Sequence, residues 1–117
     1  MPVPILKQGS YLIASIQSAL SDNEVLELRD NLVEQVGTLR ARGIVIDVAG
    51  LDVIDSFVAR SLQTISLTAR LRGAETVIVG IQPDVAMAMV HFQLNFEPLR
   101  TALDLEEGLA LLDAGPD

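Results

Sequence analysis

A serine hydroxyl lies where an apolar run of the chain gives way to a helical pattern. Residues 45–48 are typical of a strand covered on both faces, and Gly50 opens a short acidic loop after them. Asp55 and Ser56 then precede residues with helical spacing, and both are good N-cap residues. Their ordinary role is to bind the free N–H groups of the first helical turn. The same position presents the Ser56 hydroxyl at a strand-to-helix junction, where it is a possible site of modification.

Ser56 is a physically reasonable phosphoacceptor. A phosphate adds about −1.5 to −2 charges, which Asp52 and Asp55 oppose. The helix N-terminus favours the added charge by roughly 0.3–1 kcal/mol, so the opposing effects are similar in size. We therefore expect the fold to survive phosphorylation and the docking of a partner to change, because an unpaired charge in an interface is costly. Asp52, Asp55 and Phe57 are expected to border the docking surface.

Two other chemistries remain open for the same acids. Asp47, Asp52 and Asp55 are candidates to hold Mg²⁺, as in a phosphoacceptor receiver domain. That site needs acids from several strand ends and a lysine after the last strand, whereas these acids share one loop and the only lysine lies near the N-terminus. A Ser-His-Asp arrangement would need His91, the only histidine, which lies far along the chain from Ser56. We expect no catalytic residue, metal or cofactor.

The composition narrows the class of protein. The chain has 117 residues, enough for one domain, and a net charge of −8 with scattered basic residues, which disfavours nucleic acid and anionic membranes as partners. The absence of cysteine excludes disulfides and thiolate metal sites. Neither a secretion signal nor an apolar run of about 18–20 residues is found, so we expect a cytoplasmic protein.

Apolar residues are abundant for so small a domain. Half of the chain is hydrophobic, only 3% is aromatic, and the mean hydropathy is +0.40. These values predict an aliphatic core and hint that some surface is buried against other subunits. A tight core with no apolar surface left over is the alternative.

The first half of the chain predicts a hairpin, a helix and a strand. Strands over 3–7 and 10–16 are joined by a turn near Gln8–Gly9. Ser21 and Glu24 form a capping-box pattern, which begins a long amphipathic helix expected to end near Arg42–Gly43.

The second half alternates helices and strands. The helix after Ser56 is expected to bury Leu62, Ile65 and Ala69, with Phe57 and Val58 as further candidates. The remaining boundaries are a helix end at 72–73, a strand over 75–81, a helix from Pro83 to a stop at 96–98, a strand over 99–103, and a last helix after the 104–107 cap.

This order, ββαβαβαβα, predicts an α/β fold in one domain, residues 1–117, with a flexible tail at 113–117. The sheet is expected to be mixed and mostly parallel, with about five strands. Successive right-handed crossovers would place the four helices mainly on one face.

The chain resembles the STAS domain family, the fold of the bacterial anti-anti-sigma factors. The family motif is an apolar strand and a loop ending in Asp-Ser before a helix, found here as residues 44–48 and Ile54-Asp55-Ser56. Stretches at 4–7, 80–83 and 101–106 extend the resemblance to the single-domain, RsbS-type proteins of the stressosome. Phe57 and Ala59 depart from the general anti-anti-sigma pattern, where a small residue and glycine are usual, which favours the stressosome branch.

The resemblance implies a non-enzymatic scaffold and antagonist in a stress-response pathway. Its implied partners are RsbR-type STAS paralogues, further copies in a homodimer or larger assembly, and an RsbT-type switch serine kinase that leaves after phosphorylating Ser56. A phosphatase would reset the site. The alternatives are an anti-anti-sigma factor acting by simple partner switching with an anti-sigma kinase, and a small enzyme or nucleotide-binding domain. The chain has no G-x-x-x-x-G-K-[ST] or G-x-G-x-x-G motif for the last of these.

Overall fold

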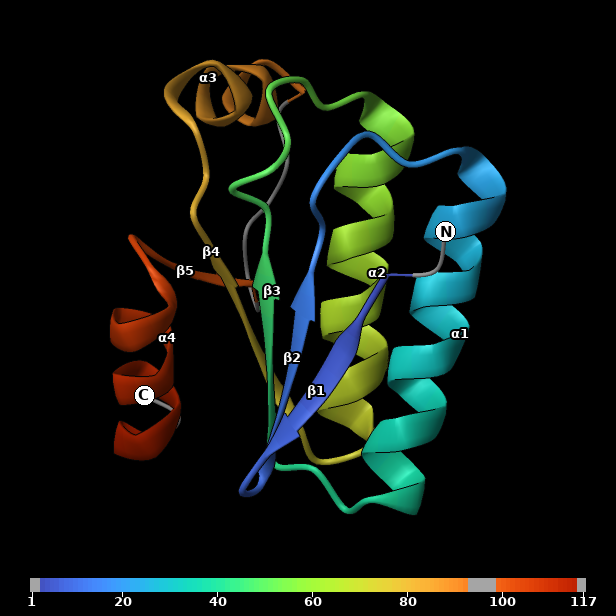
Figure 1. The fold of residues 1–117 in the computed structure, drawn as a ribbon, viewed down its shortest axis with the longest axis vertical. Helices are drawn as coiled ribbons and strands as arrows, with labels where there is room; N and C mark the ends of the chain where they lie inside the picture. Colours follow the sequence, from blue (N-terminus) through green and yellow to red (C-terminus); the bar gives the residue numbers. More distant parts are fainter. Residues whose placement is uncertain (1–2, 93–98, 116–117) are drawn as a thin grey trace.

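A computed structural model describes residues 3–92 and 99–115 and contains one five-stranded sheet with four helices (Figure 1). The strand order in the sheet is the order in the sequence, β1-β2-β3-β4-β5; β1 is antiparallel to β2 and the other neighbours are parallel. The predicted mixed sheet is therefore confirmed. The elements are β1 (Ile5–Gln8), β2 (Tyr11–Ser15), α1 (Asp22–Thr38), β3 (Gly43–Asp47), α2 (Ser56–Leu71), β4 (Glu75–Val79), α3 (Pro83–His91), β5 (Arg100–Ala102) and α4 (Leu105–Ala114).

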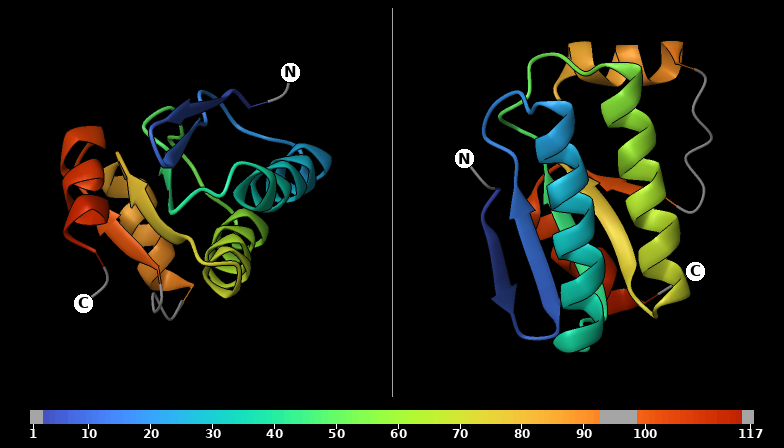
Figure 2. Two further views of the ribbon diagram at one scale, coloured as in Figure 1. Left: turned by 90° about the horizontal axis from the view of Figure 1, so that it is seen from below. Right: turned by 90° about the vertical axis from the view of Figure 1, so that its right-hand side faces the viewer.

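The central strand β3 is covered on both faces, as its continuous apolar sequence predicts. Ile44 and Ile46 belong to the core cluster beneath α1 and α2, whereas Val45 belongs to a second cluster that includes Leu112 of α4. Successive side chains of a strand point to opposite faces, so both sides of β3 need a helical cover. Figure 2 shows the sheet between the α1–α2 pair and α4.

Helix α4 is the exception to the prediction that the helices lie mainly on one face. Buried residues of α1, α2 and α3 share one core cluster, but α4 packs on the other side against β3, β4 and β5. The crossover rule concerns helices that join two parallel strands, and α4 follows the last strand. Gly108 allows a close approach there, because a Cβ at this position would lie 2.7 Å from Cγ1 of Val79.

Several predicted boundaries need correction. Helix α1 ends at Thr38, before the predicted Arg42–Gly43, because Arg40 adopts a left-handed φ of 51° and the Ala41 N–H returns to the Val36 carbonyl. The predicted tail at 113–117 begins too early, since α4 continues to Ala114. The α3 helix ends at His91, and its predicted continuation and stop fall at 93–98, outside the described residues.

The loop between β3 and α2 is fastened to the strands and loops on both sides. Asp47 accepts a hydrogen bond from the Ala49 N–H (2.9 Å), and the Gln82 side chain donates to the Ala49 carbonyl (2.7 Å). Gly50 lies against the loop that follows β2, since a Cβ at this position would be 2.5 Å from backbone atoms of Gln17. Leu51 is buried and holds the middle of the loop to the core. The residues leading to Ser56 thus have a defined path.

Thr76 is a buried polar residue whose hydroxyl has no hydrogen-bond partner among the described residues. We predict that Thr76→Val stabilises the protein by about 1 kcal/mol, because valine has the same shape and removes an unsatisfied group. Urea denaturation measures the change. Thr101→Val, at an exposed position of β5, is the matched control and should alter stability by less than about 0.5 kcal/mol. Equal or lower stability of Thr76→Val would contradict the assignment.

Gly50→Ala should destabilise the protein by about 2–3 kcal/mol, because the new methyl group would collide with the Gln17 backbone. Hydrogen exchange should also show faster exchange of the Ala49 amide as its bond to Asp47 loosens. Gly9→Ala is the control, since a Cβ at Gly9 meets nothing within 4 Å and only backbone strain is added. An Ala49 amide that exchanges equally slowly in both variants would refute the proposed packing of the loop.

Candidate functional site

Ser56 is the first residue of α2, and Asp55 is its N-cap. The Asp55 carboxylate accepts a hydrogen bond from the Val58 N–H at 2.8 Å. The two residues, which the sequence offers as equivalent caps, therefore have different roles. Because Asp55 binds the helix end, the Ser56 hydroxyl is left without a hydrogen bond within the part of the chain that the structure describes.

The Ser56 side chain is half-buried and lines an open groove of about 320 Å³ between α1 and α2. The side chain is therefore not sealed inside the aliphatic core. A phosphoacceptor has to be accessible in this way, because a kinase must reach its hydroxyl. Arg60 of α2 and Arg29 of α1 line the same groove. Arg60 follows Ser56 by four residues, a spacing that places both on one helix face and is visible in the sequence. Arg29 lies 27 positions earlier, and only the packing of α1 on α2 brings it to the groove.

The three aspartates at the end of β3 and in the loop after it do not converge on one site. Asp47 binds the Ala49 N–H, Asp55 caps α2, and Asp52 is exposed in the loop. Residues 3–92 and 99–115 contain no group of three or more His, Cys, Asp or Glu side chains arranged to hold a metal ion. Asp47 and Asp55 thus make structural contacts, at the end of β3 and at the start of α2, and the Asp52 side chain makes no hydrogen bond among the described residues.

Apolar side chains lie around the first turn of α2 and in the loop before it. Val53 is 67% exposed and Phe57 is 37% exposed, so Phe57 does not belong to the buried side of α2, where the spacing had suggested it; Val58 does. On the loop side, a hollow of about 160 Å³ is lined by Leu20, Leu51, Val53, Val58 and neighbouring residues. Exposed apolar groups on both sides of the first turn of α2 are suited to the docking of another protein.

His91 does not support a Ser-His-Asp arrangement. It is exposed in the last turn of α3, and no hydrogen bond links it to Ser56 or to an aspartate among the described residues. The structure therefore gives Ser56 no histidine base.

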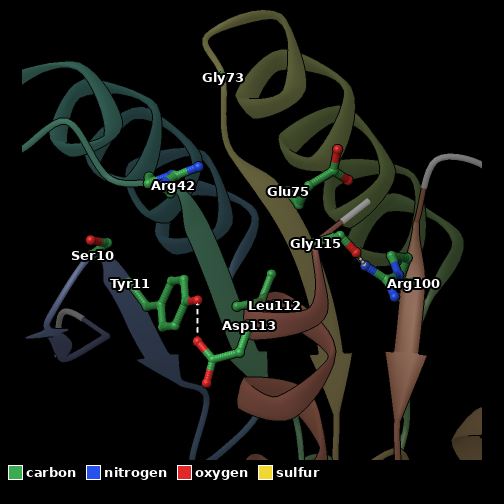
Figure 3. A pocket seen from close by; sticks show the side chains of 9 residues that line it. All are labelled: Ser10, Tyr11, Arg42, Gly73, Glu75, Arg100, Leu112, Asp113 and Gly115. Atoms are coloured by element: carbon green, nitrogen blue, oxygen red, sulfur yellow. Dashed lines mark hydrogen bonds between the residues drawn. The ribbon is translucent and has the colours of Figure 1, made fainter. Parts of the chain in front are cut away.

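A separate polar pocket of about 350 Å³ lies at the other end of the sheet, where β3 and β4 begin (Figure 3). There the Tyr11 hydroxyl donates a hydrogen bond to the Asp113 carboxylate, which joins β2 to α4 and raises the pKa of Tyr11. Arg100 donates to the Gly115 carbonyl at 3.2 Å. These contacts attach the C-terminal helix to the sheet, and the pocket shares no lining residue with the groove at Ser56.

Comparison with known proteins agrees with this geometry. The RsbS protein of Moorella thermoacetica, solved as a serine-to-glutamate variant, is 36% identical, with a TM-score of 0.85 over 96% of this chain and 95% of that one. A chain from a structure of the stressosome, described as a signal integration and transduction hub, is 37% identical, with a TM-score of 0.82 over 95% and 96% of the two chains. The similarity to RsbS inferred from sequence motifs is confirmed.

Longer relatives share the domain. The RsbT co-antagonist protein RsbRA of Bacillus subtilis is 29% identical over 107 residues, which are 92% of this chain and 38% of that protein. The chain thus spans about a third of the length of the RsbT co-antagonists that it matches. Among the described residues, no helix is both long and apolar enough to cross a membrane. The family model for the STAS domain matches residues 3–108, and the chain therefore belongs to the STAS domain family.

Proposed function

We propose that this protein is a non-enzymatic scaffold and kinase antagonist of a cytoplasmic stressosome, switched by phosphorylation of Ser56. In the unmodified state it holds an RsbT-type serine kinase together with RsbR-type STAS paralogues. Phosphorylation of Ser56 releases the kinase to a stress-response pathway, and a phosphatase resets the site.

The observation that carries this proposal is the availability of one hydroxyl. Ser56 makes no hydrogen bond among the described residues, because Asp55 performs the capping, and its side chain lines an open groove. Phe57 lines the same groove, and Val53 adds exposed apolar surface on the loop side of α2. A partner docked on these side chains would cover the hydroxyl or lie next to it.

The relatives support the choice of partners. One is named an RsbT co-antagonist, and another chain comes from a stressosome assembly. The RsbS relative matches over 95% of its length, which favours an RsbS-type role for the domain described here. RsbR-type proteins, which are longer, would supply the remaining domains of the complex.

The proposed chemistry is a phosphoryl transfer carried out by the kinase. The Ser56 oxygen bonds to the γ-phosphorus of ATP, the bond from that phosphorus to the bridging oxygen breaks, and ADP leaves. The hydroxyl proton passes to a base of the kinase. The product carries about −1.5 to −2 additional charges beside the docking side chains. A partner docked over this group would have to remove water from it, and that desolvation cost weakens binding, whereas the same charge in water does not unfold the domain.

Incubation with an RsbT-type kinase and ATP should add one phosphate to the protein, located on Ser56 by mass spectrometry of its peptides. Ser56→Ala should abolish the modification, because no other hydroxyl occupies the start of α2. Ser10→Ala is the control, since Ser10 is exposed at the opposite end of the sheet. Modification of Ser56→Ala at the same rate as the parent would exclude this site.

Ser56→Asp should weaken binding of the kinase at least about tenfold, which corresponds to about 1.4 kcal/mol. Calorimetry or surface plasmon resonance with the purified kinase measures the change, and Ser10→Asp provides a matched added charge away from the site. Unchanged affinity of Ser56→Asp would contradict a switch that acts through docking.

The formation of a large complex distinguishes this function from simple partner switching. Light scattering should detect a large complex when the protein is mixed with an RsbR-type paralogue. A stable complex with an anti-sigma kinase, and none with the paralogue, would instead favour the anti-anti-sigma function.

A further inference from the structure

Among the residues that the structure describes, the groove beside Ser56 is lined by two cations and by no acid. Arg60 comes from α2 and Arg29 from α1, and the other lining side chains are apolar or carry hydroxyls. The chain as a whole has a net charge of −8, so the groove differs in sign from the rest of the protein. An anionic group attached to Ser56 would meet positive charge from both helices.

Arg60 is available for such a group. It lies one helical turn after Ser56 on the same face of α2, a separation at which side chains interact. Its carbonyl accepts a hydrogen bond from Thr64, but its guanidinium forms no hydrogen bond or ion pair within the described part of the chain. Within residues 3–92 and 99–115, no existing side-chain bond has to break before Arg60 binds a phosphate.

Arg29 has a partner that a phosphate can replace. Its Nε and Nη2 atoms lie 3.0 and 2.9 Å from Oδ1 of Asp30. The side chains are 37% and 68% exposed, and such surface pairs are weak. A phosphate offers more charge than a carboxylate and accepts paired hydrogen bonds from one guanidinium.

The positions of the nearby acids favour placing a phosphate on Ser56 in the groove, and not on the loop side of α2. Asp55 lines the hollow on the loop side of α2, with its carboxylate bound to the Val58 N–H, and Asp52 lies in the exposed loop. Neither lines the groove that contains Arg29 and Arg60. Repulsion from these carboxylates and attraction from the arginines therefore act in the same direction.

We propose that the phosphate on Ser56 is held in the α1–α2 groove by Arg60 and Arg29, and so forms an ionic clamp between the two helices. Arg29 exchanges Asp30 for the phosphate in the modified protein. This inference rests on the proposed function only for the modification of Ser56. It changes the energetic balance expected from the sequence, because two cations now oppose the repulsion from Asp52 and Asp55. The modified protein should be the more stable form.

Phosphorus NMR tests the clamp on full-length protein that carries phosphoserine introduced at position 56 during translation, so that no kinase is needed. The second pKa of the phosphate should lie below its ordinary value of about 6, since both arginines favour the dianion. Arg60→Gln and Arg29→Gln should each return that pKa toward the ordinary value. Arg70→Gln removes an exposed cation of the same helix that does not line the groove, and should leave the pKa unchanged.

Thermal denaturation gives a second measurement. Phosphorylation should raise the melting temperature of the parent and of Arg70→Gln, and the increase should shrink in Arg60→Gln, in Arg29→Gln and at high salt. Identical phosphate titrations in all four proteins, or a lower melting temperature on phosphorylation of the parent, would overturn the clamp. A kinase that ignores Ser56 would refute the proposed function and leave these measurements valid.

Discussion

The hydrogen bond from the Val58 N–H to the Asp55 carboxylate decides what Ser56 can do. A helix start needs an acceptor for its free donors, and serine is as good a cap as aspartate. With Asp55 in that role, the next residue is the first of α2, and its hydroxyl has no partner among the described residues. Asp55 thus has the structural role, and Ser56 is left available for the modification proposed above.

The position of this pair depends on the sheet below it. Parallel strands direct their carboxyl ends to one edge, and in open α/β sheets that edge commonly carries the functional loops. Here the loop follows β3, and Gln82 beside α3 and the backbone at Gln17 after β2 restrain it. The core that aligns these strands is aliphatic and covered on both faces, and the candidate site lies outside it at the loop edge.

Local signals in the sequence predicted most of the fold. The capping box of Ser21 and Glu24 is present, and binding of the Glu24 carboxylate to the Ser21 N–H lowers the pKa of Glu24. The element order followed from hydrophobic periodicity. The end of α1 was predicted too late because Arg40 adopts a left-handed conformation that glycine was expected to supply.

The site was predictable only in part. Ser56 and its acidic neighbours are adjacent in the chain, and a four-residue spacing connects Arg60 to them. Arg29 could not be assigned, because its place beside Ser56 depends on how α1 packs on α2. The placement of α4 was equally hidden: its apolar stripe shows that one face is buried and does not say which side of the sheet buries it.

The restraints on the 48–55 loop also affect when this loop can take up its folded conformation during protein synthesis. Ala49 is held by a side chain 33 residues further along, so a nascent chain that has not yet exposed Gln82 lacks this support. Domains generally fold as units once enough of the chain has left the ribosome. Under the proposed function, a half-made chain would therefore offer a poorly shaped acceptor to the kinase, and Ser56 would be modified mainly after the domain is complete.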